Sequence, residues 1–222
     1  MSASAGRIWA CEGVGTLFLV MAVVGSGIMA ERLAGGNAAI ALLANSIATG
    51  AALLALILAC GPISGAHFNP VVSLAEVFAG RMPWRTAAIY LAAQFSGAIF
   101  AVYATHAMFG ERLVQFSSHA RSGPAQWLGE VVATFGLLWV IGSCANRKGD
   151  AVAFAVAAYI TAAYWFTSST SFANPAVTVA RALTDTFTGI RPEDVPEFIL
   201  AQLIGALGAA LLRRCMVDDP AH

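Results

Sequence analysis

An internal repeat is the feature of this sequence that most constrains its fold. Three motifs of the first half recur in the same order in the second half. The pairs are W-x-x-E-x-x-x-T at residues 9–16 and 127–134, N-P-V or N-P-A at 69–71 and 174–176, and A-Q-x-x-G-A at 93–98 and 201–206. Because the offsets between partners are similar, at 118, 105 and 108 residues, the halves correspond along their whole length. The chain is therefore predicted to be one domain, residues 1–222, with halves at approximately 1–112 and 123–222.

The composition is typical of a protein embedded in a lipid bilayer. Hydrophobic residues make up 59% of the 222 residues, charged residues only 11%, and the mean hydropathy is +0.74. The first apolar stretch, residues 13–30, is not interpreted as a signal peptide because the hydrophobic pattern continues through the whole chain. Six charge-poor stretches are predicted to cross the bilayer as helices, at residues 8–30, 38–60, 86–109, 126–145, 151–165 and 198–212.

Charge and cysteine content argue against several other classes of protein. The formal net charge is zero, which gives no reason to expect nucleic acid as a partner. The four cysteines are scattered without a C-x-x-C pair, so neither a disulfide framework nor a metal site is expected. No cofactor is predicted, and the lipid bilayer is the expected environment.

Three membrane spans in each half imply that the repeat is inverted, because an odd number of crossings makes the second half enter from the opposite side. Between the second and third spans, and between the fifth and sixth, apolar segments with helix-breaking residues are too short to cross. We expect each of these segments to dip into the bilayer and return. The predicted fold is an all-α membrane protein with six transmembrane helices and two re-entrant half-helices in an inverted repeat.

Each Asn-Pro pair is predicted to begin one of these half-helices. Asn69 and Asn174 would be N-cap residues, a position that asparagine favours. Pro70 and Pro175 would take the first helical position, where the missing N–H of proline costs nothing. A single Asn-Pro pair is usually only a turn, but two at matching places in an inverted repeat favour a pore.

The segments that precede the Asn-Pro pairs are expected to run extended at membrane depth. They are residues 65–67 and 170–172. Unpaired backbone carbonyls at that depth are tolerated only where they line water or are buried in protein. An aqueous pore is the predicted consequence.

Polar residues inside the predicted spans have competing interpretations. Glu12 and Glu130 could be helix-start carboxylates, but their depth favours a scaffold role with re-entrant backbone N–H groups as partners. The A-Q-x-x-G-A motifs are predicted to bridge helices and to allow close helix contact. For His67, a structural role and a pore-lining role are equally favoured. The remaining histidines, which lie near ends or in loops and are not expected to form a site, are His106, His119 and His222.

These motifs resemble those of the aquaporin and aquaglyceroporin (major intrinsic protein) family. The resemblance rests on the paired Asn-Pro boxes, on S-G-A-H at residues 64–67 and on the glutamate in spans one and four. It implies a homotetramer with a pore in each protomer and passive flux of water or small uncharged solutes. By similarity, the amides of Asn69 and Asn174 would donate hydrogen bonds to solute at the pore centre. The implied acceptor track consists of the carbonyl groups of Gly65, Ala66, His67, Thr170, Ser171 and Phe172.

Several positions depart from the family's pattern. The first box ends in Val71, a mild change, whereas the second ends in Ala176. Where the family normally has a filter arginine the chain has Val177, and Thr178 replaces the aspartate of glycerol facilitators. The other implied filter residues are Thr49, Ala162 and Ser171. Without an arginine, a histidine or an aromatic side chain, this filter is expected to be wide and weakly polar.

A wide filter is similar to that of the bacterial aquaporins that accompany arsenic-resistance genes. This resemblance implies permeation by glycerol-like polyols and by uncharged metalloid acids such as arsenous acid. It also implies location in the inner membrane of a bacterium. Placing both termini in the cytoplasm puts seven lysine and arginine residues inside and five outside, which is a modest positive-inside bias.

Two other functional classes are less favoured. A secondary transporter can also be built on an inverted repeat, but proton or sodium coupling usually needs a carboxylate in the pathway. Both intramembrane glutamates instead lie at matched positions near helix starts. An intramembrane hydrolase would need a nucleophile and a base together, and the sequence has no G-x-S-x-G elbow. The protein is therefore not expected to be an enzyme.

Overall fold

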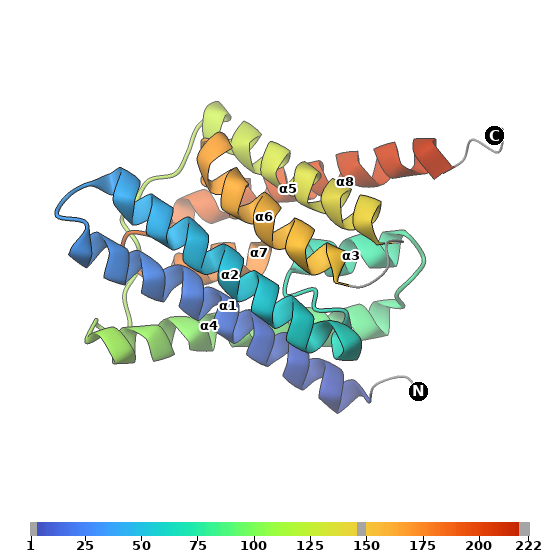
Figure 1. The fold of residues 1–222 in the computed structure, drawn as a ribbon, viewed down its shortest axis with the longest axis horizontal. Coiled ribbons are helices and arrows are strands. Elements are labelled where there is room, and N and C mark those ends of the chain that lie inside the picture. Colours follow the sequence, from blue (N-terminus) through green and yellow to red (C-terminus); the bar gives the residue numbers. More distant parts are fainter. Residues whose placement is uncertain (1–3, 146–149, 218–222) are drawn as a thin grey trace.

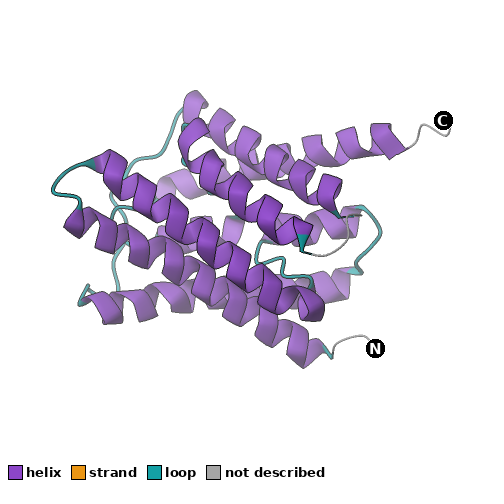
Figure 2. Ribbon diagram, viewed as in Figure 1, coloured by secondary structure: helices purple, strands orange, loops and turns teal. Residues whose placement is uncertain are grey.

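The computed structural model describes residues 4–145 and 150–217, and all regular secondary structure within these ranges is helical (Figure 2). The helices are α1 (Ala5–Leu33), α2 (Ala38–Ser64), α3 (Pro70–Phe78), α4 (Trp84–Phe109), α5 (Pro124–Cys144), α6 (Ala151–Phe166), α7 (Pro175–Arg181) and α8 (Val195–Val217). A short 3₁₀ turn, Pro192–Asp194, comes directly before α8.

Six of these helices correspond to the predicted membrane spans. Five of them, α1, α2, α4, α5 and α8, are long and apolar enough to cross a bilayer. The sixth, α6, is a shorter apolar helix of 16 residues, about 24 Å long at the usual rise per residue. The short helices α3 and α7 begin at the two Asn-Pro pairs. The predicted all-helical fold is confirmed.

The two halves of the chain form equivalent groups of helices. In the first half α1 packs against α2 and α4, and in the second half α5 packs against α6 and α8. Contact between α2 and α6 joins the halves. As Figure 1 shows, α1 begins and α8 ends at the same end of the bundle, on the right. The half-helix α3 lies nearer that end and α7 nearer the opposite end, as an inverted repeat requires.

Glycines of the A-Q-x-x-G-A motifs allow the closest helix contacts in each half. A Cβ atom on Gly97 in α4 would overlap the backbone of Gly13 in α1. A Cβ atom on Gly205 in α8 would likewise overlap the carbonyl oxygen of Val131 in α5. Since the obstacle in both cases is helix backbone, which cannot rotate away, only glycine permits these separations.

Gly97→Ala is therefore expected to force α1 and α4 apart and to lower the free energy of unfolding by about 1–3 kcal/mol, the usual cost of overpacking. Thermal unfolding of the detergent-purified protein, followed by circular dichroism, measures the change. Gly61→Ala in α2 is the matched control, because a Cβ atom there meets nothing within 4 Å. Equal melting temperatures for the two variants would contradict the close-contact role of Gly97.

Candidate functional site

The N-termini of the two half-helices meet inside the bundle, and each is capped by its asparagine. The Oδ1 atom of Asn69 accepts a hydrogen bond from the N–H of Val71 at 3.1 Å. In the second half, the Oδ1 atom of Asn174 accepts from the N–H groups of Ala176 and Val177, at 3.0 and 3.3 Å. Both asparagines have extended backbones, and proline follows each at the first helical position. These are the N-cap roles predicted from the sequence.

The amide nitrogens of the same asparagines join the two halves across the centre of the bundle. The Nδ2 atom of Asn69 donates to the carbonyl of Ala173 at 2.7 Å, and that of Asn174 donates to the carbonyl of Phe68 at 2.8 Å. An amide NH₂ group has two hydrogens, so each asparagine keeps one further donor. Both side chains line the central cavity, where that donor is available to a solute.

The loops that lead into the half-helices do not run extended, so this part of the prediction is wrong. Ala66 and Phe68 in the first loop have φ angles of 52° and 49°, and three residues of the second loop are also left-handed. For residues other than glycine this conformation costs roughly 1–2 kcal/mol each. Such backbone strain persists only where surrounding contacts hold it in place. In both loops these contacts come from a buried glutamate.

Glu12, which is fully buried in α1, holds the first loop. One carboxylate oxygen accepts from the Ser64 hydroxyl at 2.6 Å and from the N–H of His67 at 3.0 Å. The other accepts from the N–H of Phe68 at 2.8 Å and from Nε2 of Gln94 at 2.9 Å. The glutamate lies two turns into the helix, not in its first turn, so the helix-start interpretation does not apply.

Glu130 holds the second loop in the same way. It is fully buried in α5 and accepts from the N–H groups of Phe172 and Ala173, at 2.8 and 2.9 Å. Nε2 of Gln202 donates to it at 2.7 Å. The two glutamates and the two motif glutamines therefore make equivalent contacts in the two halves, and every carboxylate oxygen has a donor. Neither carboxylate is among the groups that line the central cavity.

A cavity of about 150 Å³ passes between the halves, and both half-helix N-termini contribute to it. The predicted site residues that line it are Thr49, Gly65, Ala66, His67, Asn69, Ser171, Phe172, Asn174 and Val177. The box residues Pro70, Val71, Pro175 and Ala176 are buried behind the asparagines. Apolar side chains of α1, α2, α5 and α6 form most of the remaining wall. His67 both lines the cavity and makes a structural contact, with Nδ1 3.0 Å from Oγ of Ser73.

Two residues that were predicted to line the pore, Ala162 and Thr170, do not line this cavity. Ala162 is exposed on the outside of α6, whereas Ile160 and Tyr164 of the same helix line the cavity. Because two residues correspond to about 200° around an α-helix, a position between two lining residues must face away. Thr170, which was predicted to belong to the carbonyl track, does not line the cavity. It lies in a turn in which its N–H donates a hydrogen bond to the carbonyl of Thr167.

The wall of the cavity also includes an aromatic and an arginine side chain that lie outside the predicted set of filter residues. Tyr164 lines the cavity, and its hydroxyl lies 3.2 Å from Oγ1 of Thr49. Arg181 lines it as well, from the last position of α7, one helical turn beyond Val177. The four-residue spacing between Val177 and Arg181 is a signal in the sequence that could have identified this arginine, since residues at i and i+4 share a helix face.

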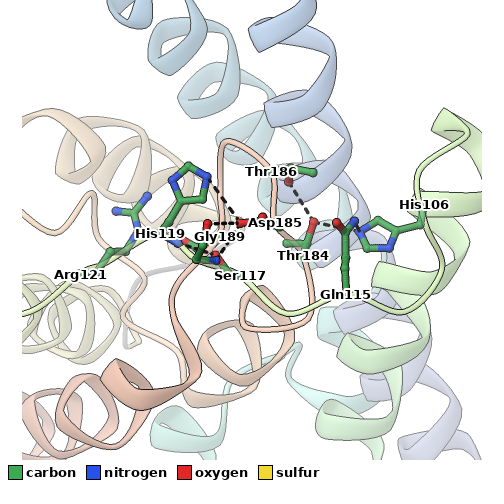
Figure 3. Close-up of polar contacts among 10 residues, drawn as sticks. His106, Gln115, Ser117, His119, Arg121, Thr184, Asp185, Thr186 and Gly189 are labelled. Atoms are coloured by element: carbon green, nitrogen blue, oxygen red, sulfur yellow. Dashed lines mark hydrogen bonds and ion pairs between the residues drawn. The ribbon is translucent and has the colours of Figure 1, made fainter.

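The end of the bundle that contains Arg181 is covered by the loop between α4 and α5. Figure 3 shows this loop, residues 110–123, bound to the segment that follows α7. The N–H and hydroxyl of Ser118 donate to Asp185 at 2.8 and 2.9 Å, and these hydrogen bonds hold the pKa of Asp185 below its usual range. Arg121 of the loop lies over the ring of Phe172. Burial lowers the pKa of the Arg121 guanidinium, an effect that the Glu130 carboxylate opposes.

His106, which was not expected to form a site, is a buried anchor for this loop. Its Nε2 atom lies 2.9 Å from Oγ1 of Thr184 (Figure 3), and Nδ1 lies 3.3 Å from the carbonyl of Leu113. The neighbouring hydroxyl of Thr186 extends the network at 2.9 Å from Thr184. The hydropathy pattern could not predict the burial of His106, because its partners come from two separate segments, the loop before α5 and the segment after α7.

Membrane-spanning helices arranged as an inverted repeat, around a cavity at which two half-helices meet, define a membrane channel. The chain belongs to the major intrinsic protein family, whose model matches residues 1–151 and 144–221. It is 52% identical over 207 residues to aquaglyceroporin AqpS of Rhizobium meliloti (strain 1021), a match that covers 93% of this chain and 88% of that protein. It is 34% identical over 207 residues to aquaporin NIP1-1 of Zea mays, covering 90% of this chain and 71% of that protein.

A solved structure has the same fold. The X-ray structure of the aquaglyceroporin from Plasmodium falciparum matches with a TM-score of 0.72 over 98% of this chain and 100% of that one. The identity of 19% limits this comparison to the fold. Family membership and the curated relatives establish a multi-pass membrane channel for water and small solutes.

Proposed function

We propose that this channel passes glycerol-like polyols and uncharged metalloid acids such as arsenous acid, in addition to water. The observation that supports this range is the small side chains at the second half-helix: Val177 takes the place of a long filter side chain, beside Ser171. Thr49 and Tyr164 supply hydroxyl groups to the same cavity. A solute with several hydroxyl groups would find donors and acceptors there.

Passive flux is favoured over coupled transport by the state of the intramembrane carboxylates. Glu12 and Glu130 each accept three or more hydrogen bonds from their own half of the chain. Glu76, which reaches the cavity from α3, accepts two 2.6 Å hydrogen bonds from Arg81. Carboxylates held in this way are poorly suited to bind and release a coupling ion with each cycle.

Val177→Arg is expected to convert a permissive pore into a restrictive one. Arginine would add a long side chain and five donors at a position only 5% exposed, narrowing the cavity and holding water tightly. Glycerol flux is expected to fall about tenfold or more, and water flux by less. Stopped-flow swelling of proteoliposomes with water, glycerol, urea and arsenous acid measures both quantities.

The matched control for this test is Val114→Arg, the same substitution at a residue that is 71% exposed in the loop at residues 110–123. It is expected to leave every flux unchanged. A wild-type protein that passes water but rejects glycerol would refute the wide solute range. A Val177→Arg variant that matches the wild type for every solute would show that this position does not restrict the pore.

We also infer the assembly of the chain from its family and its orientation from the distribution of lysine and arginine residues. The chain forms a homotetramer of single-domain protomers, each with its own pore, in the inner membrane of a bacterium with both termini in the cytoplasm. The start of α1 and the end of α8, which lie at the same end of the bundle in Figure 1, are then cytoplasmic. Arg181 and the loop at residues 110–123 are then periplasmic. Chemical cross-linking in membranes and protease access to tagged termini test these two statements.

A further inference from the structure

Arg181 occupies an unusual position at the periplasmic end of the cavity. It is only 2% exposed, yet it is one of the residues that line the cavity. Its guanidinium carbon lies 3.3 Å from the centre of the Phe172 ring, so the group is stacked on an aromatic face. Nε donates to the carbonyl of Thr188. The guanidinium is therefore held in one place by a ring and one backbone contact.

Most of the hydrogen-bonding capacity of this arginine is unused. A guanidinium has five N–H donors, of which four belong to the two terminal nitrogens. Among the described residues, no protein atom accepts a hydrogen bond from either terminal nitrogen of Arg181. Because these nitrogens belong to a side chain that lines the cavity, they are available to a solute or ion inside it.

A second guanidinium lies against the same aromatic ring. The guanidinium carbon of Arg121 is 5.1 Å from the centre of Phe172. Its Nε donates to the carbonyl of Gly189 at 2.8 Å, while Nη1 makes only long contacts of 3.5 Å with Ser169 and Thr170. The other terminal nitrogen has no acceptor in the part of the chain that the structure describes. Two guanidinium groups thus lie against one aromatic ring, and that of Arg181 also lines the cavity.

Within the described residues, neither guanidinium forms an ion pair with a carboxylate. Within residues 4–145 and 150–217, neither Arg121 nor Arg181 has a carboxylate oxygen within 4.0 Å of its side chain. By contrast, Arg32 and Arg191, at the same end of the bundle, are paired with carboxylates at 2.7 and 2.8 Å. The nearby Glu130 carboxylate is already used by loop N–H groups. A cation as buried as Arg181 is costly unless it is paired, so a partner from solution is expected.

We propose that Arg181 and Arg121 form a binding site for a small oxyanion, of the size of acetate, at the periplasmic mouth of the pore. The free nitrogens of Arg181 provide the parallel donors that bind two oxygens of one anion, and Arg121 adds a second charge. A cavity of about 150 Å³ has room for such an anion with a few waters. A bound anion would obstruct neutral solutes. This obstruction rests on the proposed function, whereas the binding itself does not.

Binding is tested on the detergent-purified protein without any measurement of transport. Sodium acetate or sodium methanesulfonate replaces chloride at constant ionic strength, and calorimetric titration and thermal unfolding record the affinity. Wild type is expected to bind both anions and to melt at a higher temperature in their presence. Arg181→Leu is expected to weaken binding at least about tenfold, and Arg181→Lys by less, because lysine keeps the charge but loses the planar fork.

Two further variants make the binding test independent of any folding defect in Arg181→Leu. Arg121→Leu is expected to weaken binding as well, since it removes the second charge. Arg32→Leu, a control at the same end whose guanidinium already has Glu111 as its partner, is expected to bind like the wild type. Absence of binding of both anions to the wild type would overturn the proposal. Unchanged affinity in correctly folded Arg181→Leu, Arg181→Lys and Arg121→Leu would also overturn it.

A flux measurement then separates the two proposals. External methanesulfonate, which stays ionised, is expected to slow glycerol entry into wild-type proteoliposomes but not into those with Arg181→Leu. If the anion binds and no glycerol flux exists, the glycerol-permeable pore is refuted and the anion site stands. If glycerol flux is normal and no anion binds, the anion site is refuted and the pore stands.

Discussion

Glu130→Ala is expected to prevent the channel from reaching its folded state. The change removes the acceptor of three buried donors, the N–H groups of Phe172 and Ala173 and the side-chain amide of Gln202. Each buried donor left unpaired costs about 1–3 kcal/mol, so the total approaches the whole stability of a typical domain. The left-handed residues of the second loop would also lose the contacts that hold them. Expression yield, elution of the detergent-purified protein as a single species and the melting temperature measure the effect.

The control for this prediction is Glu111→Ala, which removes a carboxylate from a partly exposed pair with Arg32. Exposed pairs of this kind contribute about 0–1 kcal/mol, so that variant is expected to fold normally. Glu130→Gln keeps one acceptor oxygen and is expected to give an intermediate result. A Glu130→Ala protein with the yield and melting temperature of the wild type would refute the role of this carboxylate in holding the loop.

Asn174→Asp and Asn69→Asp are expected to abolish solute flux in proteins that still assemble. An aspartate at either position keeps the oxygen that caps the half-helix. It loses the amide donor, so a carboxylate oxygen would face the carbonyl of Phe68 or Ala173 at the distance of a hydrogen bond. The new negative charge would also attract cations into the pore. Solute-induced swelling and cation leak in proteoliposomes provide the measurements.

Two controls separate the donor role from the cap role. Asn37→Asp makes the same change at an exposed N-cap, that of α2, where Nδ2 has no opposing carbonyl among the described residues, and flux is expected to be normal. His67→Ala removes a lining side chain and one hydrogen bond to Ser73, and a smaller loss of flux is expected. Normal flux and normal ion exclusion in both aspartate variants would place these asparagines outside the conducting path.

Equivalence between the halves explains why much of the site could be predicted without coordinates. Each motif of the repeat occurs twice at a similar offset, so a role that suits both copies is favoured over one that suits a single copy. Two Asn-Pro pairs predict two N-caps, and two glutamates at matched depth predict the same kind of partner. The bonds made by Glu12 and Glu130 to loop N–H groups follow this equivalence closely.

The sequence positions of the filter residues do not predict correctly which side chains form the wall of the cavity. The family resemblance implies Ala162 as a filter residue, but Ala162 is exposed and Tyr164 of the same helix faces the cavity. Each residue turns the side-chain direction by about 100°, so an error of two residues moves a side chain to the opposite face of the helix. The arginine that lines the cavity, Arg181, lies one helical turn beyond position 177, where the family normally has its filter arginine.

The sequence by itself determined the membrane environment, the inverted repeat, the six spans and the capped half-helices, because hydropathy and capping depend on residues that are close along the chain. Only the tertiary structure decided which side chains face the cavity and how the end of the cavity near Arg181 is built. Arg121 and His106 owe their places to partners 48 to 78 residues away, on loops whose pairing no local pattern specifies. The left-handed loops also depend on tertiary contacts, because a distant glutamate must be in place before that backbone becomes favourable.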